Sequence, residues 1–208
     1  MKSTLKNMVL VLLGITFVSS AAVGFVYRVT EEPIEQAKQA NVKSALAEVL
    51  PAFDESVSQE LVLDELALTV HTATQQGQTV GYAVETATKN GFSGLIRMMV
   101  GFDAEGNVLN VKVLEHNETP GLGSKMADEG NPLLASFQGK NPASMKLSVR
   151  KDGGEVDALT AATISSRAYV DAVARAYNAY LQASGNEGTD VTTGATGQHA
   201  QQEGESYE

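Results

Sequence analysis

The chain has 208 residues with 15 Lys or Arg and 25 Asp or Glu, which gives a formal net charge of −10 at pH 7. An acidic chain without a dense Lys/Arg patch does not suit nucleic acid, because that binding depends on neutralising phosphates with basic side chains. The sequence has no Cys, which excludes disulfides, zinc–thiolate sites and iron–sulfur clusters held by this chain's own thiolates.

An uncharged stretch lies near the N-terminus, at residues 8–27 (MVLVLLGITFVSSAAVGFVY). It is long enough to cross the hydrocarbon core of a bilayer, which takes about 20 helical residues. Lys2 and Lys6 precede it and acidic residues follow. By the positive-inside rule, residues 1–7 are predicted to stay in the cytoplasm, and the rest of the chain to lie outside. A cleaved signal peptide is the alternative, since SSAA supplies suitable small residues, but the length favours a retained transmembrane helix.

Residues 28–51 are predicted to form an amphipathic helix that acts as a stalk between membrane and domain. Thr30 suits its N-cap and Pro33 its first turn, and Pro51 ends it.

Four segments rich in Val, Leu, Thr and aromatic residues follow, and each predicts a strand. They are LALTVHTAT, TVGYAVETAT, LIRMMVGF and VLNVKVLEH. The connections QQGQ, KNGFSG and DAEGN contain the Gly and Asn residues that hairpins require. We therefore predict an α+β domain at residues 52–183, built on an antiparallel sheet with flanking helices.

The second half of this domain is predicted to be less regular. A long loop at residues 117–132 is of a length that is usually functional or disordered. NPLLASFQG predicts a short helix, MKLSV and EVDAL predict short strands, and apolar residues from Tyr169 to Tyr180 recur at helical spacing. Residues 184–208 are acidic and rich in Gly, Gln, Thr and Ser, so we predict a disordered tail.

The segment DALTAATISS at residues 157–166 combines hydroxyls with small residues. A helix start explains part of it, with Ser165 or Ser166 as N-cap. It does not explain Thr160 or Thr163, which have two alanines between them. Small residues let a bulky group approach the backbone, and a helix that begins just beyond Thr163 would favour a phosphate there. A plain helix start and a phosphate ester on Thr163 both fit these residues.

This segment resembles the flavinylation motif Asp-x-x-Ser/Thr-Gly-Ala-Thr of the FMN-binding domain in the G subunit of Rnf-type electron transport complexes. The C subunit of the sodium-translocating NADH:quinone reductase is its sibling. The resemblance implies that a flavin transferase links FMN covalently, through its phosphate, to Thr163, with Asp157, Thr160 and Ala162 in the site. Ala161 stands where the family usually has Gly. Because Ala disfavours the left-handed region, we expect a negative φ at Ala161.

A second segment, DVTTGAT at residues 190–196, matches the motif more literally. Gly197 and Gln198 follow it, and neither a helix nor a strand is predicted beside it. We therefore favour Thr163 as the attachment site and regard Thr196 as a coincidence or a second attachment point.

The long loop gives independent support, because EHNETPGLGSKM resembles the family's His-x-Glu-Thr-Pro-Gly-Leu-Gly signature. In the family this loop lies against the isoalloxazine ring. Two glycines would allow close approach to a flat ring, Leu122 would pack on its face and Thr119 would bond its polar edge. His116 is expected to orient the loop. The cofactor-binding residues implied here are Glu118, Thr119, Gly121, Leu122 and Gly123.

The resemblance implies an electron-transfer subunit without catalytic residues or a metal site of its own. It would work in ferredoxin:NAD⁺ oxidoreduction coupled to Na⁺ or H⁺ translocation. The implied partners are iron–sulfur, flavin and other membrane subunits of the complex, a flavin transferase and membrane lipid. The alternatives are the C subunit of the quinone reductase, a flavin-free membrane-anchored adaptor, and a stand-alone FMN-domain reductase.

Overall fold

A computed structural model describes residues 5–63, 66–185 and 191–193. The chain divides into two units, residues 1–42 and residues 43–208. Helix α1 (Leu5–Val49) supplies the described part of the first unit, and its last turns belong to the second.

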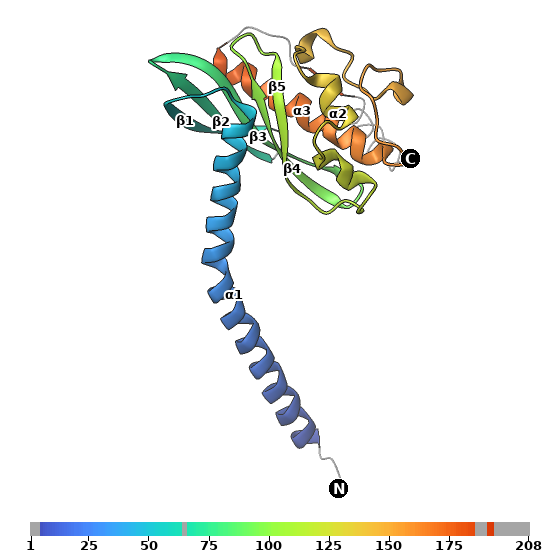
Figure 1. Cartoon of the computed structure of the whole chain (residues 1–208). Coiled ribbons are helices and arrows are strands. Elements are labelled where there is room, and N and C mark those ends of the chain that lie inside the picture. Colours follow the sequence, from blue (N-terminus) through green and yellow to red (C-terminus); the bar gives the residue numbers. More distant parts are fainter. Residues whose placement is uncertain (1–4, 64–65, 186–190, 194–208) are drawn as a thin grey trace, which may run out of the picture. The chain divides into compact units, whose positions relative to one another are not determined.

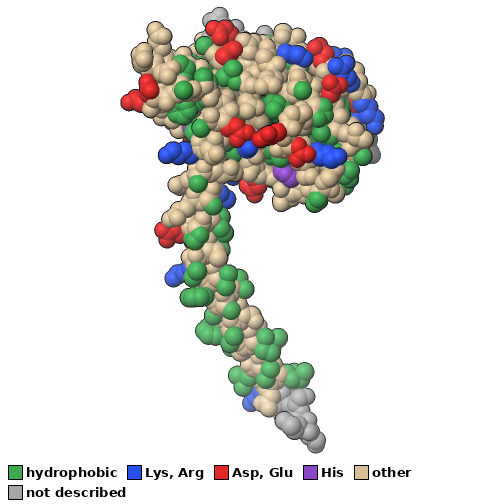
Figure 2. All heavy atoms as spheres, in the orientation of Figure 1, with side chains coloured by type: hydrophobic (Ala, Val, Ile, Leu, Met, Phe, Trp, Pro, Cys, Tyr) green, Lys and Arg blue, Asp and Glu red, His purple; other side chains and the backbone are tan. Residues whose placement is uncertain are grey.

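Helix α1 is continuous where a transmembrane helix and a separately capped stalk were predicted. Thr30 lies inside it, and its hydroxyl donates to the carbonyl of Val26 at 2.9 Å. The predicted N-cap is therefore wrong. Pro33 is also internal, at the cost of one intrahelical hydrogen bond. By length and composition α1 can cross a membrane, and Figure 2 shows hydrophobic side chains along its surface. The limits 8–27 and 28–51 for span and stalk stay predictions.

The second unit is built on one antiparallel sheet whose five strands follow chain order, β1 to β5 (Figure 1). The four predicted segments correspond to β2 (Leu66–Gln75), β3 (Gln78–Gly91), β4 (Gly94–Phe102) and β5 (Val108–His116). The predicted α+β fold with an antiparallel sheet is confirmed.

Strand β1 (Glu55–Leu63) was not predicted. Among the strands that the structure describes it lies at the edge and pairs with β2, from Glu55 opposite Thr74 to Leu63 opposite Leu66. Most of its side chains are exposed, so the periodic burial that marks a strand in sequence is weak. The strand forms through backbone pairing with β2, and its composition alone does not predict it.

Helix α3 (Thr163–Ser184) packs on one face of the sheet, chiefly on β3 and β4. Because side chains alternate along a strand, Phe102 on β4 points to that face and lies 5.2 Å, centroid to centroid, from the ring of Tyr180. The neighbouring Gly101 faces the other way. A Cβ there would lie 2.1 Å from the carbonyl oxygen of Val49, so only Gly lets the end of α1 rest directly on the sheet.

Short helices and turns connect β5 to α3. They are η1 (Gly123–Ala127), α2 (Pro132–Phe137), η2 (Pro142–Ser144) and η3 (Arg150–Asp152). Helix α2 is the predicted short helix, and the side chain of Asn131 caps it by accepting from the N–H of Leu134 at 3.0 Å.

The two short strands predicted at 145–149 and 155–159 are wrong. These segments meet in one isolated parallel bridge, Val149 to Val156. The turn between them is so tight that a Cβ on Gly154 would lie 2.0 Å from the carbonyl oxygen of Ser148. Parallel strands need a crossover of a dozen or more residues, which this turn cannot provide.

His71 on β2 makes the stability of the folded domain depend on pH. Its Nδ1 lies 2.8 Å from the hydroxyl of Ser58. Burial lowers the pKa of His71 below its usual 6.5, and Glu85 opposes that shift only in part. The folded chain thus binds fewer protons at His71 than the unfolded chain, so this contribution to stability is present above pH 6.5 and is lost as the pH falls below it.

We expect the unfolding midpoint in urea to fall between pH 7 and pH 5, and to fall less in His71→Asn, whose amide can still reach Ser58. His199→Gln, which removes a histidine outside the described residues, is the matched control. Equal pH slopes in wild type and His71→Asn would contradict the assignment.

Candidate functional site

The threonine motif and the long loop meet, although 24 residues (133–156) separate them in sequence. Together with the β3–β4 turn they border a pocket of about 280 Å³. Its lining residues are Phe92, Glu118, Thr119, Leu122, Gly123, Ala161, Ala162, Thr163, Ile164 and Ser165.

Glu118 holds these three segments together. One carboxylate oxygen accepts from the backbone N–H of Ser93 at 3.0 Å, and the other accepts from the hydroxyl of Ser165 at 2.6 Å. Its own N–H donates to Nδ1 of His116 at 3.2 Å, in keeping with the expected orienting role of that histidine. The carboxylate is buried and both of its oxygens bond the protein, so Glu118 positions the pocket walls.

Two glycines make this close packing possible. A Cβ on Gly123 would lie 2.6 Å from both the Glu118 carboxylate and the Ser165 hydroxyl. A Cβ on Gly91 would lie 2.7 Å from the other oxygen of Glu118. Real Cβ atoms do not come so near, so the buried carboxylate requires Gly on both sides. The sequence analysis predicted Gly91 as part of the KNGFSG turn and not as a residue of the site.

Helix α3 begins at Thr163, with Ala162 as its N-cap residue and no side chain capping it. The predicted caps, Ser165 and Ser166, lie within the first turn. Ser166 donates to the carbonyl of Ala162 at 2.9 Å and accepts from the N–H of Leu159 at 2.9 Å. Ser166 therefore ties down the chain before the helix, while Ser165 bonds Glu118. The partial positive charge of the helix start is left facing the pocket mouth at Thr163.

Ala161 has a φ of 60°, in the left-handed region, so the expected negative φ is wrong. The turn is closed by a bond from the N–H of Ala162 to the carbonyl of Leu159, at 3.2 Å. The turn geometry places residue 161 in the left-handed region, and Ala adopts it at a cost of about 1–2 kcal/mol.

Replacing Ala161 with Gly should raise the unfolding free energy by up to about 1 kcal/mol, because relief of that strain outweighs the greater freedom of Gly in the unfolded chain. Chemical denaturation of the full chain in detergent measures it. Ala158→Gly, outside any helix or strand and not a positive-φ residue, is the control and should destabilise. A loss of stability in Ala161→Gly would contradict the strain.

Three large apolar side chains around the pocket are exposed to solvent. Phe92 is 65% exposed, Leu122 42% and Ile164 46%. Only Leu122 was predicted. Phe92 belongs to the β3–β4 turn and reaches the pocket because that turn lies beside Glu118, which sequence spacing does not reveal. This rim suits a flat aromatic ligand, which would cover it.

Three predicted site residues do not line the pocket. Asp157 forms an ion pair with Arg150, the N–H of Gly121 donates to the hydroxyl of Ser124 at 2.9 Å, and Thr160 is exposed beside the turn. The motif's second copy at 190–196 has only residues 191–193 within the described part of the chain, and Thr196 lies outside it.

No group of three or more His, Cys, Asp or Glu residues that could hold a metal ion occurs within the part of the chain that the structure describes. The pocket presents hydroxyls, an apolar rim and a helix start. These are groups that suit a phosphate and a ring.

Comparisons with known proteins agree with this geometry. Residues 91–178 match the family described as the FMN-binding domain. The G subunit of the ion-translocating oxidoreductase complex of Shewanella loihica is 35% identical over 178 residues, which cover 79% of this chain and 84% of that protein. The corresponding G subunit of Aliivibrio fischeri strain ES114 is 35% identical over 189 residues, or 85% and 90% of the two chains. That of Vibrio cholerae is 37% identical over 179 residues, or 80% and 86%. The chain belongs to the family of G subunits of ion-translocating oxidoreductase complexes.

Proposed function

We propose that the chain is an electron-carrying subunit of a membrane-bound, Rnf-type ion-translocating oxidoreductase complex and bears FMN as a phosphoester on Thr163. The observation that carries the proposal is the position of Thr163. It stands at the uncapped start of a 22-residue helix, at the mouth of the pocket that the loop signature also lines. Family membership and the FMN-binding domain match support the same cofactor.

The residues present fit the parts of FMN. The helix start favours the phosphate electrostatically, and the neighbouring alanines leave room for it. The exposed side chains of Phe92, Leu122 and Ile164 supply apolar surface for the ring. FMN, when bound, supplies the exchange of electrons, and the chain's own residues tether, orient and partly desolvate it.

A covalent bond suits this role. Electron carriers must hold the flavin in both oxidation states, so tight binding of one state alone does not suffice. An ester to Thr163 keeps the flavin in place in either state, and it prevents loss outside the cytoplasm, where we place the domain. A flavin transferase would form the bond.

The proposed setting follows from α1. Lys2 and Lys6 before the apolar stretch favour a cytoplasmic N-terminus, with residues 8–27 in lipid and the FMN domain outside the cytoplasm. The other subunits of the complex would exchange electrons with the flavin. Ferredoxin and NAD⁺ would be the terminal partners, and Na⁺ or H⁺ the coupled ion.

Peptide mass spectrometry of the chain from its native membrane tests the proposal. The expected result is the mass of FMN less one water on the peptide that contains Thr163, located by fragmentation. The same mass only on the peptide with Thr196 would move the site to the C-terminal region. Its absence from both would overturn covalent attachment.

A further inference from the structure

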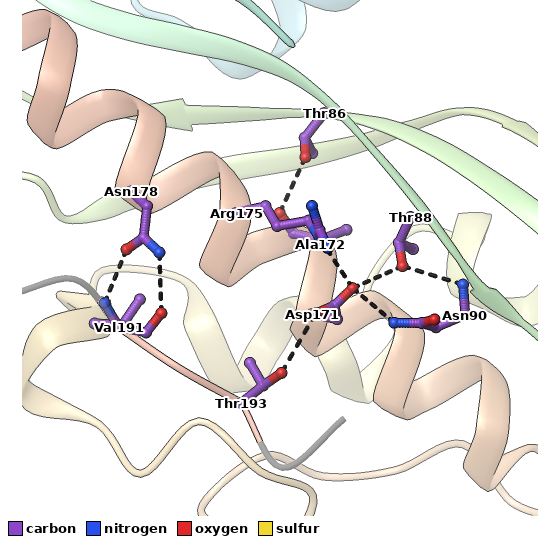
Figure 3. Close-up of polar contacts among 9 residues, drawn as sticks. All are labelled: Thr86, Thr88, Asn90, Asp171, Ala172, Arg175, Asn178, Val191 and Thr193. Atoms are coloured by element: carbon purple, nitrogen blue, oxygen red, sulfur yellow. Dashed lines mark hydrogen bonds and ion pairs between the residues drawn. The ribbon is translucent and has the colours of Figure 1, made fainter. Parts of the chain in front are cut away.

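Residues 191–193 lie along α3 (Figure 3). In sequence they are far from the loop at residues 117–132. Its main contact is a reciprocal pair of hydrogen bonds with one side chain. The N–H of Val191 donates to Oδ1 of Asn178 at 2.8 Å, and Nδ2 of Asn178 donates to the carbonyl of Val191 at 3.0 Å. An amide side chain that bonds both backbone groups of one residue recognises extended chain and not a particular side chain.

A second anchor lies two residues on. The hydroxyl of Thr193 is 3.4 Å from Oδ1 of Asp171. Asp171 is almost fully buried, and its other oxygen accepts from the hydroxyl of Thr88 at 2.7 Å and from the side-chain amide of Asn90 at 3.1 Å. That oxygen also pairs with Nε of Arg175, one turn further along α3, at 3.3 Å. The carboxylate is thus held by β3 and by Arg175, as Figure 3 shows, and its other oxygen lies beside the segment.

The three residues belong to no assigned strand, but their burial alternates. Val191 is half-buried and packs against the hydrophobic core, Thr192 is exposed, and Thr193 is buried. Alternate side chains of an extended chain point to opposite sides, so the first and third face α3. Specificity would come from those two positions and affinity from the backbone, as in other recognition of extended peptides.

We propose that Asn178 and Asp171 form a binding site on α3 for an extended peptide, and that its ligand is residues 191–193 of the same chain. The site selects a residue with a β-branched apolar side chain, followed two positions later by a hydroxyl. Docking ties the C-terminal region to the domain. It also takes up residues 191–193 of the second motif copy, so an enzyme that acts on that copy must first release them.

Hydrogen–deuterium exchange of the full chain in detergent, resolved to single amides, tests the site. We expect the Val191 amide to exchange about tenfold faster in Asn178→Leu than in wild type, as the loss of two hydrogen bonds implies. Gln182→Leu makes the same change at an exposed position of α3 and should leave the rate unchanged. Equal rates at Val191 in wild type and Asn178→Leu would overturn the proposal.

A pair of variants in the segment itself keeps the test independent of the stability of α3. Thr193→Val removes the hydroxyl that faces Asp171 and keeps the shape, and should speed exchange at Val191 about threefold or more. Thr192→Val makes the same change at the neighbouring exposed residue and should have no effect. If both variants behave alike, Thr193 is not an anchor and the proposed site is wrong.

Discussion

The variant Thr163→Val is expected to lose covalent FMN completely when it is co-expressed with a flavin transferase and exported. Valine has nearly the shape of threonine and lacks the hydroxyl that forms the ester, so the domain should fold unchanged. In-gel flavin fluorescence after denaturation measures the bound cofactor. Thr163→Ser, which restores a hydroxyl at the helix start, should recover part of the signal.

Thr196→Val serves as the control, because it removes the corresponding hydroxyl of the second motif copy and leaves Thr163 intact. It should keep full fluorescence. Undiminished fluorescence in Thr163→Val would place the flavin elsewhere, and its loss in Thr196→Val would point to the C-terminal stretch.

Glu118→Ala is expected to lower the unfolding free energy by about 3 kcal/mol or more. The carboxylate accepts from the N–H of Ser93 and the hydroxyl of Ser165, and hydrogen bonds to a buried charged group contribute about 1.5–3 kcal/mol each. The variant would also leave a cavity between the loop and α3. Thermal unfolding of the full chain in detergent should show a melting temperature lower by about 6–12 °C.

Glu129→Ala is the matched control, since Glu129 belongs to the same loop and is exposed. It should change stability by no more than about 0.5 kcal/mol. Glu118→Gln keeps the shape and one acceptor oxygen, and should fall between the two. A melting temperature in Glu118→Ala equal to that of the control would mean that Glu118 does not hold the three segments together.

The sequence by itself determined the parts that depend on local pattern. Alternation of apolar residues and Gly/Asn turns located β2 to β5, because strands of a half-buried sheet carry their burial pattern in sequence. The segment NPLLASFQG located the short helix α2. The uncharged run at residues 8–27, which belongs to α1, was recognised because its length and composition suit a membrane span. Resemblance of two short motifs placed the chain in a family that the comparisons confirm.

Tertiary structure decided what depends on contacts between distant segments. Strand β1 exists because β2 pairs with it, and residues 145–159 fail to form strands because a tight turn folds them back on each other. Ala161 adopts a left-handed φ because the surrounding turn outweighs its local preference. Glu118, predicted as a flavin-binding residue, lines the pocket and also bonds Ser93 and Ser165, which only the folded chain brings beside it. Phe92 reaches the pocket because the turn between β3 and β4 lies beside Glu118. Local preferences are worth about 1 kcal/mol per residue, and burial of several side chains together exceeds them.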